Sequence, residues 1–169
     1  MPAVIILAEP DPRWAEQYRA QEDGIRTALG PIAHTVEHVG STSVPGLAAK
    51  PILDILLVVP DATDEPSYVP ALERAGYAFF LREPLWHEHR LLKGTEPWVN
   101  LHVFPIGSAE IERMLLFRDR LRGHPAERRL YEDTKRRLSM QEWESVQDYA
   151  DAKTEVVEAI IRRAREGLG

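Results

Sequence analysis

The chain has 169 residues, of which 44% are hydrophobic and 28% are charged. This composition is typical of a globular protein, and the length is sufficient for one domain with its own core. The formal net charge of −6 argues against a large surface for duplex DNA, so nucleic acid is not an expected partner. Because cysteine is absent, disulfide bonds and thiolate sites are excluded, and a metal would be held by Asp, Glu, His, Asn or water.

Neither a membrane span nor a signal peptide is expected. No apolar run of about 18 residues occurs, and the N-terminus lacks the pattern of a secretory leader. We therefore expect a cytoplasmic protein. The charge is unevenly distributed, since residues 1–110 hold 8 Lys and Arg against 15 Asp and Glu, whereas residues 111–169 hold 13 against 12.

The first part of the chain predicts a strand, a helix and a second strand. The aliphatic residues 4–7 favour a short strand. Asp11-Pro12 is a suitable start for a helix, and Gly30-Pro31 ends the helical spacing of apolar residues that follows. Residues 32–39 are rich in β-branched side chains and predict the next strand.

The middle of the chain predicts a central strand and an antiparallel hairpin. Residues 52–59 are almost all aliphatic, as in a strand that is covered on both faces. A short helix over residues 68–75 and a strand over residues 77–81 follow. Residues 86–92 and 98–104 then predict the two strands of a hairpin.

From residue 108 onward the apolar residues repeat with helical spacing. Gly123-His124-Pro125 interrupts the first helix and begins a second, and a long last helix is expected over about residues 144–165. The outline is an α+β fold. A mixed sheet of about five or six strands, flanked by helices, occupies residues 1–107, and a C-terminal helical segment occupies residues 108–169.

A run of small hydroxyl residues separates the strands expected over residues 32–39 and 52–59. Backbone N–H groups and hydroxyls in such a run can contact phosphate oxygens without obstruction by a large side chain. The residues are Gly40, Ser41, Thr42 and Ser43. Their spacing is that of neither a P-loop nor a dinucleotide fold, and an ordinary turn would use the same residue types.

Asp54 strengthens the phosphate interpretation, because it brings a carboxylate into an otherwise apolar strand. A Gly-Ser pair at the end of one strand, with an acid on the next, is how nucleotidyltransferases place a metal ion beside a bound triphosphate. The alternative role for Asp54 is to accept hydrogen bonds from nearby backbone.

The string from Glu37 to Asp54, with its core Gly-Ser-Thr-Ser-Val-Pro-Gly-Leu-x-x-Lys-Pro, resembles the GrpB family. The resemblance extends over nearly the whole chain through Asn100-Leu101-His102-Val103, Phe117-Arg118-Asp119, Leu121-Arg122 and His124-Pro125. It implies a single domain over residues 1–169 that is similar to the nucleotidyltransferase superfamily. Members of the family also occur fused to dephospho-CoA kinase.

The resemblance to nucleotidyltransferases is incomplete at the metal ligands. Those enzymes usually have Asp-x-Asp or Asp-x-Glu, but here Leu56 occupies the second position. Asn100 and His102 share one strand face and stand where a third acid is usual. The expected ligands are Asp54, His102, Asn100 and His38. Imidazole favours Mn²⁺, Zn²⁺ or Fe²⁺ over Mg²⁺, and a buried His102 that only hydrogen-bonds to Asp54 is the alternative.

Two Tyr-x-Asp-x-Lys segments in the helical part each place a tyrosine and a lysine one turn apart, Tyr131 with Lys135 and Tyr149 with Lys153. Lys153 interrupts an apolar stripe, and a lysine that faces a core usually has an anionic partner. We expect both lysines, Tyr149 and Lys50 to contact phosphates. Lysine stems that pack on the tyrosine rings while their ammonium groups reach water would give the same spacing.

These features predict a metal-dependent nucleotidyltransferase with Asp54 and His102 as catalytic residues. Its cofactor is a divalent ion, Mg²⁺, Mn²⁺ or Zn²⁺, and its substrates are a nucleoside triphosphate and a small-molecule acceptor that enters near residues 86–90. His87 and His89 share a strand face in that region, next to Glu88 and Arg90, and they are expected either to be solvated, which these neighbours favour, or to line the substrate path. A binding module of the same fold without transfer activity is the alternative, which Leu56 favours, and a metal-dependent phosphoesterase is a third possibility.

Overall fold

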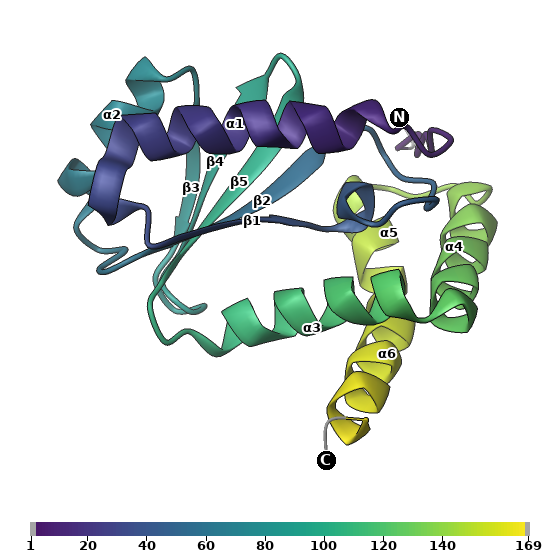
Figure 1. Ribbon diagram of the computed structural model, residues 1–169. Helices are drawn as coiled ribbons and strands as arrows, with labels where there is room; N and C mark the ends of the chain where they lie inside the picture. Colours follow the sequence, from purple (N-terminus) through teal and green to yellow (C-terminus); the bar gives the residue numbers. More distant parts are fainter. Residues whose placement is uncertain (1–2, 168–169) are drawn as a thin grey trace.

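The computed structural model describes residues 3–167, in which five strands and six α-helices form a mixed α+β fold (Figure 1). The expected fold class is therefore confirmed. The elements are α1 (Arg13–Leu29), β1 (Thr35–Val39), β2 (Leu53–Val59), α2 (Val69–Arg74), β3 (Ala78–Glu83), β4 (His89–Thr95), β5 (Trp98–Pro105), α3 (Ala109–Gly123), α4 (Pro125–Ser139), α5 (Val146–Ala152) and α6 (Thr154–Glu166). None of the described helices is both long and apolar enough to cross a membrane.

The sheet has the strand order β1-β2-β5-β4-β3. β2 and β5 are parallel, and the other neighbouring pairs are antiparallel. β2 is an interior strand of the sheet, and both of its faces are buried, which explains its nearly continuous aliphatic sequence. The parallel register sets Asp54 opposite Asn100 and Leu56 opposite His102, so these four side chains share one face of the sheet.

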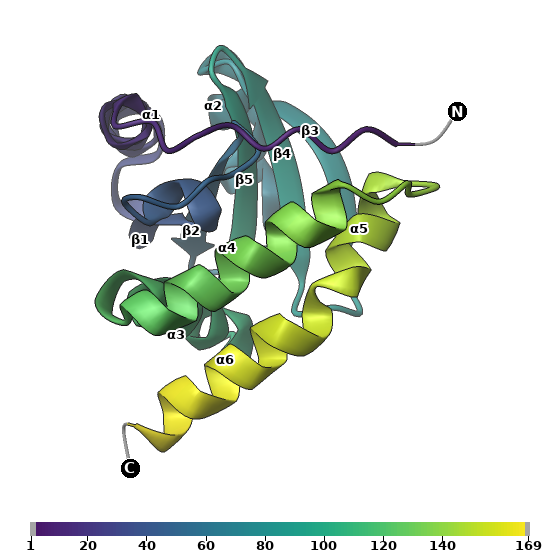
Figure 2. The same ribbon diagram turned by 90° about the vertical axis from the view of Figure 1, so that its right-hand side faces the viewer.

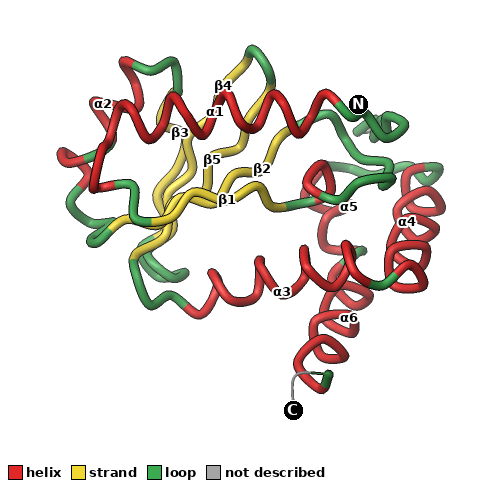
Figure 3. The backbone as a smooth tube through the Cα atoms, viewed as in Figure 1, coloured by secondary structure: helices red, strands yellow, loops and turns green. Residues whose placement is uncertain are grey.

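Helices cover the two faces of the sheet unequally. Figure 1 shows α1 and α2 along one face and α3 across the other. The main core lies between the sheet and α1, and a smaller cluster joins Val39, Leu56 and Phe104 to α3. Figure 2 shows α4, α5 and α6 at one end of the sheet. In Figure 3 the loop after β1 lies at this same end, beside α5.

Two expected elements differ from the structure. Residues 4–7 form no strand, because the segment makes only single bridges, from Ala3 to Trp143 and from Ala8 to Ala49. The expected last helix is divided into α5 and α6 at Lys153, whose N–H donates to the Ala150 carbonyl three residues back, as in a tight turn. The hairpin β4–β5 and the break between α3 and α4 are confirmed, although β4 begins and ends three residues later than expected.

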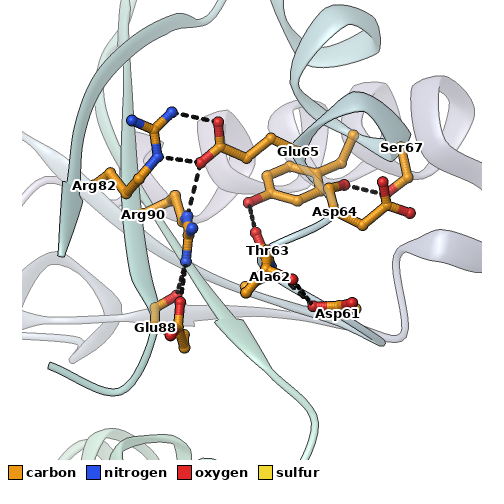
Figure 4. Close-up of polar contacts among 10 residues, drawn as sticks. Asp61, Ala62, Thr63, Asp64, Glu65, Ser67, Arg82, Glu88 and Arg90 are labelled. Atoms are coloured by element: carbon orange, nitrogen blue, oxygen red, sulfur yellow. Dashed lines mark hydrogen bonds and ion pairs between the residues drawn. The ribbon is translucent and has the colours of Figure 1, made fainter. Parts of the chain in front are cut away.

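A charged cluster holds β3 and β4, at one edge of the sheet, to the turn before α2 (Figure 4). Glu65, in the turn before α2, accepts from both Arg82 and Arg90. Arg90 is 4% exposed and also donates to the Glu88 carboxylate at 2.8 Å. The two guanidinium groups, that of Arg82 above all, hold the pKa of Glu65 at about 2. The cluster joins three segments around the buried Arg90 side chain.

The Glu65→Gln substitution is expected to lower the free energy of unfolding at pH 7 by about 1–3 kcal/mol, since it removes a charged acceptor from a buried arginine. A carboxyl whose pKa is depressed stabilises the fold above its unfolded pKa, and this contribution disappears as the pH falls from about 4.5 to about 2. The difference between the wild type and Glu65→Gln in urea unfolding should shrink over that range. The exposed Glu73→Gln is the control, and a difference that does not vary with pH would contradict this account.

Candidate functional site

A cavity of about 200 Å³ lies where the β1–β2 loop, the first residues of β2 and β5, and helices α4 and α5 meet. It brings together residues that are far apart in the sequence. Nine of the expected site residues line it: Gly40, Ser41, Thr42, Lys50, Asp54, Asn100, Lys135, Tyr149 and Lys153. Ser43, His102 and His38 do not line it.

The close approach of Gly40 to Asp54 forms one wall of the cavity. Val39 is paired with Asp54 in the sheet, so the next residue, Gly40, passes directly beside the carboxylate. A Cβ atom at Gly40 would lie 2.5 Å from Asp54 Oδ2, and the φ of 71° is one that residues with a side chain rarely adopt. Glycine is therefore required here for both steric and conformational reasons.

The loop that follows is closed by its own hydroxyl groups. Residues 41–43 form one turn of 3₁₀-helix, in which the Ser43 Oγ donates to the Gly40 carbonyl at 2.5 Å. Ser43 is 4% exposed, so it stabilises the turn instead of facing the cavity. The expectation that Ser43 contacts a ligand is not matched by its position, whereas Ser41 and Thr42 do face the cavity.

Asp54 is the first residue of a hydrogen-bonded series that crosses the sheet. Asp54 Oδ1 lies 3.1 Å from His102 Nε2, and His102 Nδ1 lies 3.1 Å from His89 Nε2. His89 Nδ1 lies 2.7 Å from Glu83 Oε1. The direct contact between Asp54 and His102, which the hydrogen-bonding alternative predicts, is thus present, and it continues through two further side chains to the edge of the sheet.

His89 is a residue whose environment the sequence interpretation missed. It was expected to be solvated, but it is 4% exposed and stacks on His102 with ring centroids 5.3 Å apart. Burial lowers the pKa of His89, and the Glu83 carboxylate opposes that shift. The hairpin register contained the signal, because pairing Thr95 with Trp98 sets β4 residues near 89–91 beside His102.

Three lysine side chains converge on the cavity. Lys135 is 2% exposed and donates to Ser41 Oγ at 2.9 Å and to the Ala48 carbonyl at 2.6 Å. Burial, together with the charges of Lys153 and Lys50, lowers the pKa of Lys135 to about 7. Burial and Lys50 lower the pKa of Lys153 to about 8. Among the described lining residues only Asp54 carries a carboxylate, so positive charge predominates.

Tyr149 lies between two of these lysines. The Nζ atoms of Lys153 and Lys50 lie 4.7 Å and 5.9 Å from the centroid of its ring. The ring is fully buried, and its hydroxyl has no hydrogen-bond partner in the part of the chain that the structure describes. An unpaired buried hydroxyl is costly, so this group is a candidate donor to a bound ligand.

The alternative in which the lysines only pack on tyrosine rings fits the structure in part. Lys135 and Lys153 do lie over the rings of Tyr131 and Tyr149. The ammonium group of Lys135, however, is buried and does not reach water. The alternative therefore fails for Lys135 and stays open for Lys153, which is partly exposed.

His38 is not brought together with the other expected metal ligands. It is paired with Ile55, on the face of the sheet opposite Asp54, and its ring stacks on Tyr18 of α1 at 4.7 Å. His38 Nε2 contacts Thr42 Oγ1 at 2.9 Å, and burial lowers the pKa of His38 to about 4. The expectation that His38 is a ligand with Asp54 is thus corrected by the alternation of side chains along β1 and β2.

The remaining potential ligands are few. Asp54, His102 and the amide of Asn100 share one face, and Leu56 beside them is buried against α3. No group of three His, Asp or Glu side chains arranged to hold a metal occurs in residues 3–167. A metal here would take two or three ligands from the protein.

The sequence and the structure were compared with those of known proteins. The model of the family described as GrpB protein matches residues 4–163. A UPF0157 protein from Halalkalibacterium halodurans is 54% identical over 162 residues, which cover 96% of this chain and 83% of the relative. A UPF0157 protein from Streptomyces coelicolor is 48% identical over 158 residues, which cover 94% of this chain and 83% of the relative.

One solved structure agrees over nearly the full length. The conserved protein GrpB from Enterococcus faecalis superposes with a TM-score of 0.80 at 30% identity, covering 94% of this chain and 98% of that chain. The match of the family model and the identity to full-length relatives lead to one conclusion. The chain belongs to the GrpB family.

Proposed function

We propose that this protein binds a nucleoside triphosphate with a divalent metal ion in the cavity beside Gly40 and Asp54, and transfers a nucleotidyl group to a small cytoplasmic acceptor. The observation that carries the proposal is the convergence of Lys50, Lys135 and Lys153 on one cavity, which Tyr149 also lines. Three ammonium groups that face one another repel unless an anion lies between them. Phosphate groups supply both the negative charge and acceptors for the lysines and the tyrosine.

The size of the cavity favours phosphates as its contents. A volume of about 200 Å³ is smaller than the ~300–1,000 Å³ of most small-molecule pockets. It suits the phosphate part of a nucleotide, with the nucleoside outside. Because Gly40 has no side chain, phosphate oxygens can approach its backbone closely, as in other glycine-containing phosphate loops.

The residues beside the cavity fit a metal ion that arrives with its nucleotide. Asp54, His102 and Asn100 offer oxygen and nitrogen ligands, and the 3.1 Å between Asp54 Oδ1 and His102 Nε2 suits two ligands of one ion. Mg²⁺ and similar ions commonly take only one or two carboxylates from the protein, and phosphates and water complete their coordination. Such an ion would offset phosphate charge and polarise the P–O bond that breaks.

The chain's own residues have separate roles in this scheme. During transfer, an acceptor oxygen or nitrogen forms a bond to the α-phosphorus as the P–O bond to pyrophosphate breaks. Lys50 and Lys153 lie where they can neutralise the charge that develops on the leaving pyrophosphate. Lys135 already donates a hydrogen bond to Ser41, so it stabilises the loop and also adds to the positive charge of the cavity.

A second candidate is a nucleotide-binding module that performs no transfer. Leu56 supports it, because the side chain that occupies the usual place of a second carboxylate is fully buried and packs against α3. Binding without release of pyrophosphate, across a panel of hydroxyl, amine and carboxylate acceptors, would favour this candidate.

The first test measures binding through thermal unfolding. With ATP, GTP, CTP or UTP plus Mg²⁺, Mn²⁺ or Zn²⁺, the nucleotide that binds should raise Tm by roughly 5–10 °C at about 100 times its Kd. Asp54→Asn should remove the part of this rise that depends on metal, because it removes the carboxylate charge. The exposed Asp23→Asn is the matched control. If no nucleotide raises Tm with any metal, the proposed function is wrong.

The second test uses Lys153→Met, which keeps most of the side-chain volume and removes the charge. We expect Kd for the nucleotide to rise about tenfold, in line with the loss of one charge-assisted contact of about 1.5 kcal/mol. The unliganded variant should be at least as stable as the wild type at pH 7, because a buried charge next to Lys50 is lost.

The pH dependence has a definite sign. The folded pKa of Lys153, about 8, is below its unfolded value of 10.5, so the cost of the buried charge declines as pH rises from 8 to 10.5. The stability advantage of Lys153→Met should therefore shrink over that range. Lys93→Met, on a strand outside the cavity, is the control. Unchanged nucleotide affinity in Lys153→Met would exclude a phosphate role for this lysine.

A further inference from the structure

A second cavity, of about 380 Å³, is lined by the start of α1, by residues 42–46 of the β1–β2 loop and by Arg122 of α3. It contains two expected site residues that do not line the first cavity, His38 and Ser43. We propose that the second cavity binds a small organic molecule with one carboxylate on an apolar body. This site is separate from the site of the proposed function and does not depend on it.

The walls of the second cavity are mostly apolar. They include Pro12, Trp14, Ala15, Val44 and Pro45. Trp14 and Val44 are 7% and 2% exposed and belong to hydrophobic core clusters, so packing fixes the walls that they form. The volume falls within the ~300–1,000 Å³ of pockets that hold small molecules. The apolar body of a ligand would therefore leave water when it binds here.

Arg122 gives this cavity a positive charge that pairs with no carboxylate of residues 3–167. Its Nε donates to the Ser43 carbonyl at 2.9 Å, which is the only hydrogen bond of the Arg122 side chain to the described residues. The neighbouring Arg118, in contrast, pairs with Glu37 and Asp119. Burial and the charge of Arg118 lower the pKa of Arg122, as expected for a cation without a close counter-charge. Both terminal nitrogens of this guanidinium can thus donate to a ligand.

The charge balance of the second cavity favours a carboxylate over a phosphate. Asp11, the one acid among its described lining residues, already accepts from the backbone N–H and the Nη2 of Arg13, each at 2.9 Å. Burial lowers the pKa of His38 to about 4, so its ring is neutral at pH 7. The remaining charge of Arg122 matches a monocarboxylate, which an arginine can bind through two parallel N–H groups. A phosphate, with about two negative charges, is matched better by the three lysines of the first cavity.

The first test is an NMR titration of the ¹⁵N-labelled protein at pH 7, without nucleotide or metal. The probes are phenylacetate and hexanoate, which carry one carboxylate on a ring and on a chain, and molecules of this size should bind with a millimolar Kd. At least one of them should shift the side-chain N–H signal of Trp14, which is identified by its loss in Trp14→Phe, and the shift should saturate. If neither carboxylate shifts this signal, the proposal is wrong.

The charge of the ligand is tested with the matched amides, phenylacetamide and hexanamide. They should bind about tenfold more weakly than the carboxylates, because one charge-assisted contact is lost. Inorganic phosphate should also bind here more weakly than the carboxylates, because it has no apolar body. Equal affinity for acid and amide, or tighter binding of phosphate, would contradict the assignment of an organic carboxylate.

Arg122→Gln tests the residue that is assigned to the carboxylate. The Kd of the carboxylate that binds should rise about tenfold, while the Kd of its amide should stay the same, which also shows that the cavity is intact. Arg129→Gln, at an exposed position of α4 outside the cavity, makes the same change of charge and should alter neither Kd. An unchanged Kd for the carboxylate in Arg122→Gln would overturn the assignment.

Ala15→Phe tests the location of the site. Ala15 is exposed on α1 and lines the second cavity, so a larger side chain should occupy part of the cavity and leave the core undisturbed. We expect acid and amide alike to bind at least about tenfold more weakly, in line with the loss of apolar contact area. Ala20→Phe, exposed on the same helix and outside the cavity, should bind both as the wild type does. Unchanged binding in Ala15→Phe would show that the probes bind elsewhere and would overturn the proposed site.

Discussion

The pairing of β1 with β2 is the constraint on which the rest of the site depends. Because Val39 is opposite Asp54, the chain leaves the sheet at Gly40, directly against the carboxylate. A one-residue shift in that register would turn Asp54 into the main core and bring an aliphatic side chain to the cavity. The site thus needs both a glycine at position 40 and this register of β1 with β2.

The parallel pairing of β2 with β5 supplies the second half of the site. It sets Asn100 and His102 beside Asp54 although almost fifty residues separate them in the sequence. The β4–β5 hairpin then brings His89 and Glu83 into line with His102. Four strands therefore contribute to one polar row, and the opposite face of the sheet carries the main apolar core.

The sequence was sufficient to predict the fold class, most elements and most of the cavity lining, because each depends on local pattern or on the motif around Gly40. The errors arose where tertiary contacts decide. His38 was expected to lie with Asp54, but strand alternation directs it to α1. His89 was taken as solvated because Glu88 and Arg90 flank it, although both neighbours are paired with each other. The break at Lys153 has no sequence signal such as glycine or proline.

The walls of the cavity beside Asp54 come from two different parts of the fold. Lys135 and Lys153 come from the C-terminal helical segment, whereas Lys50 and Asp54 come from the sheet and its loop. An anion bound between them as proposed would contact both parts, so its binding free energy would include a contribution from the docking of α4 and α5 on the sheet.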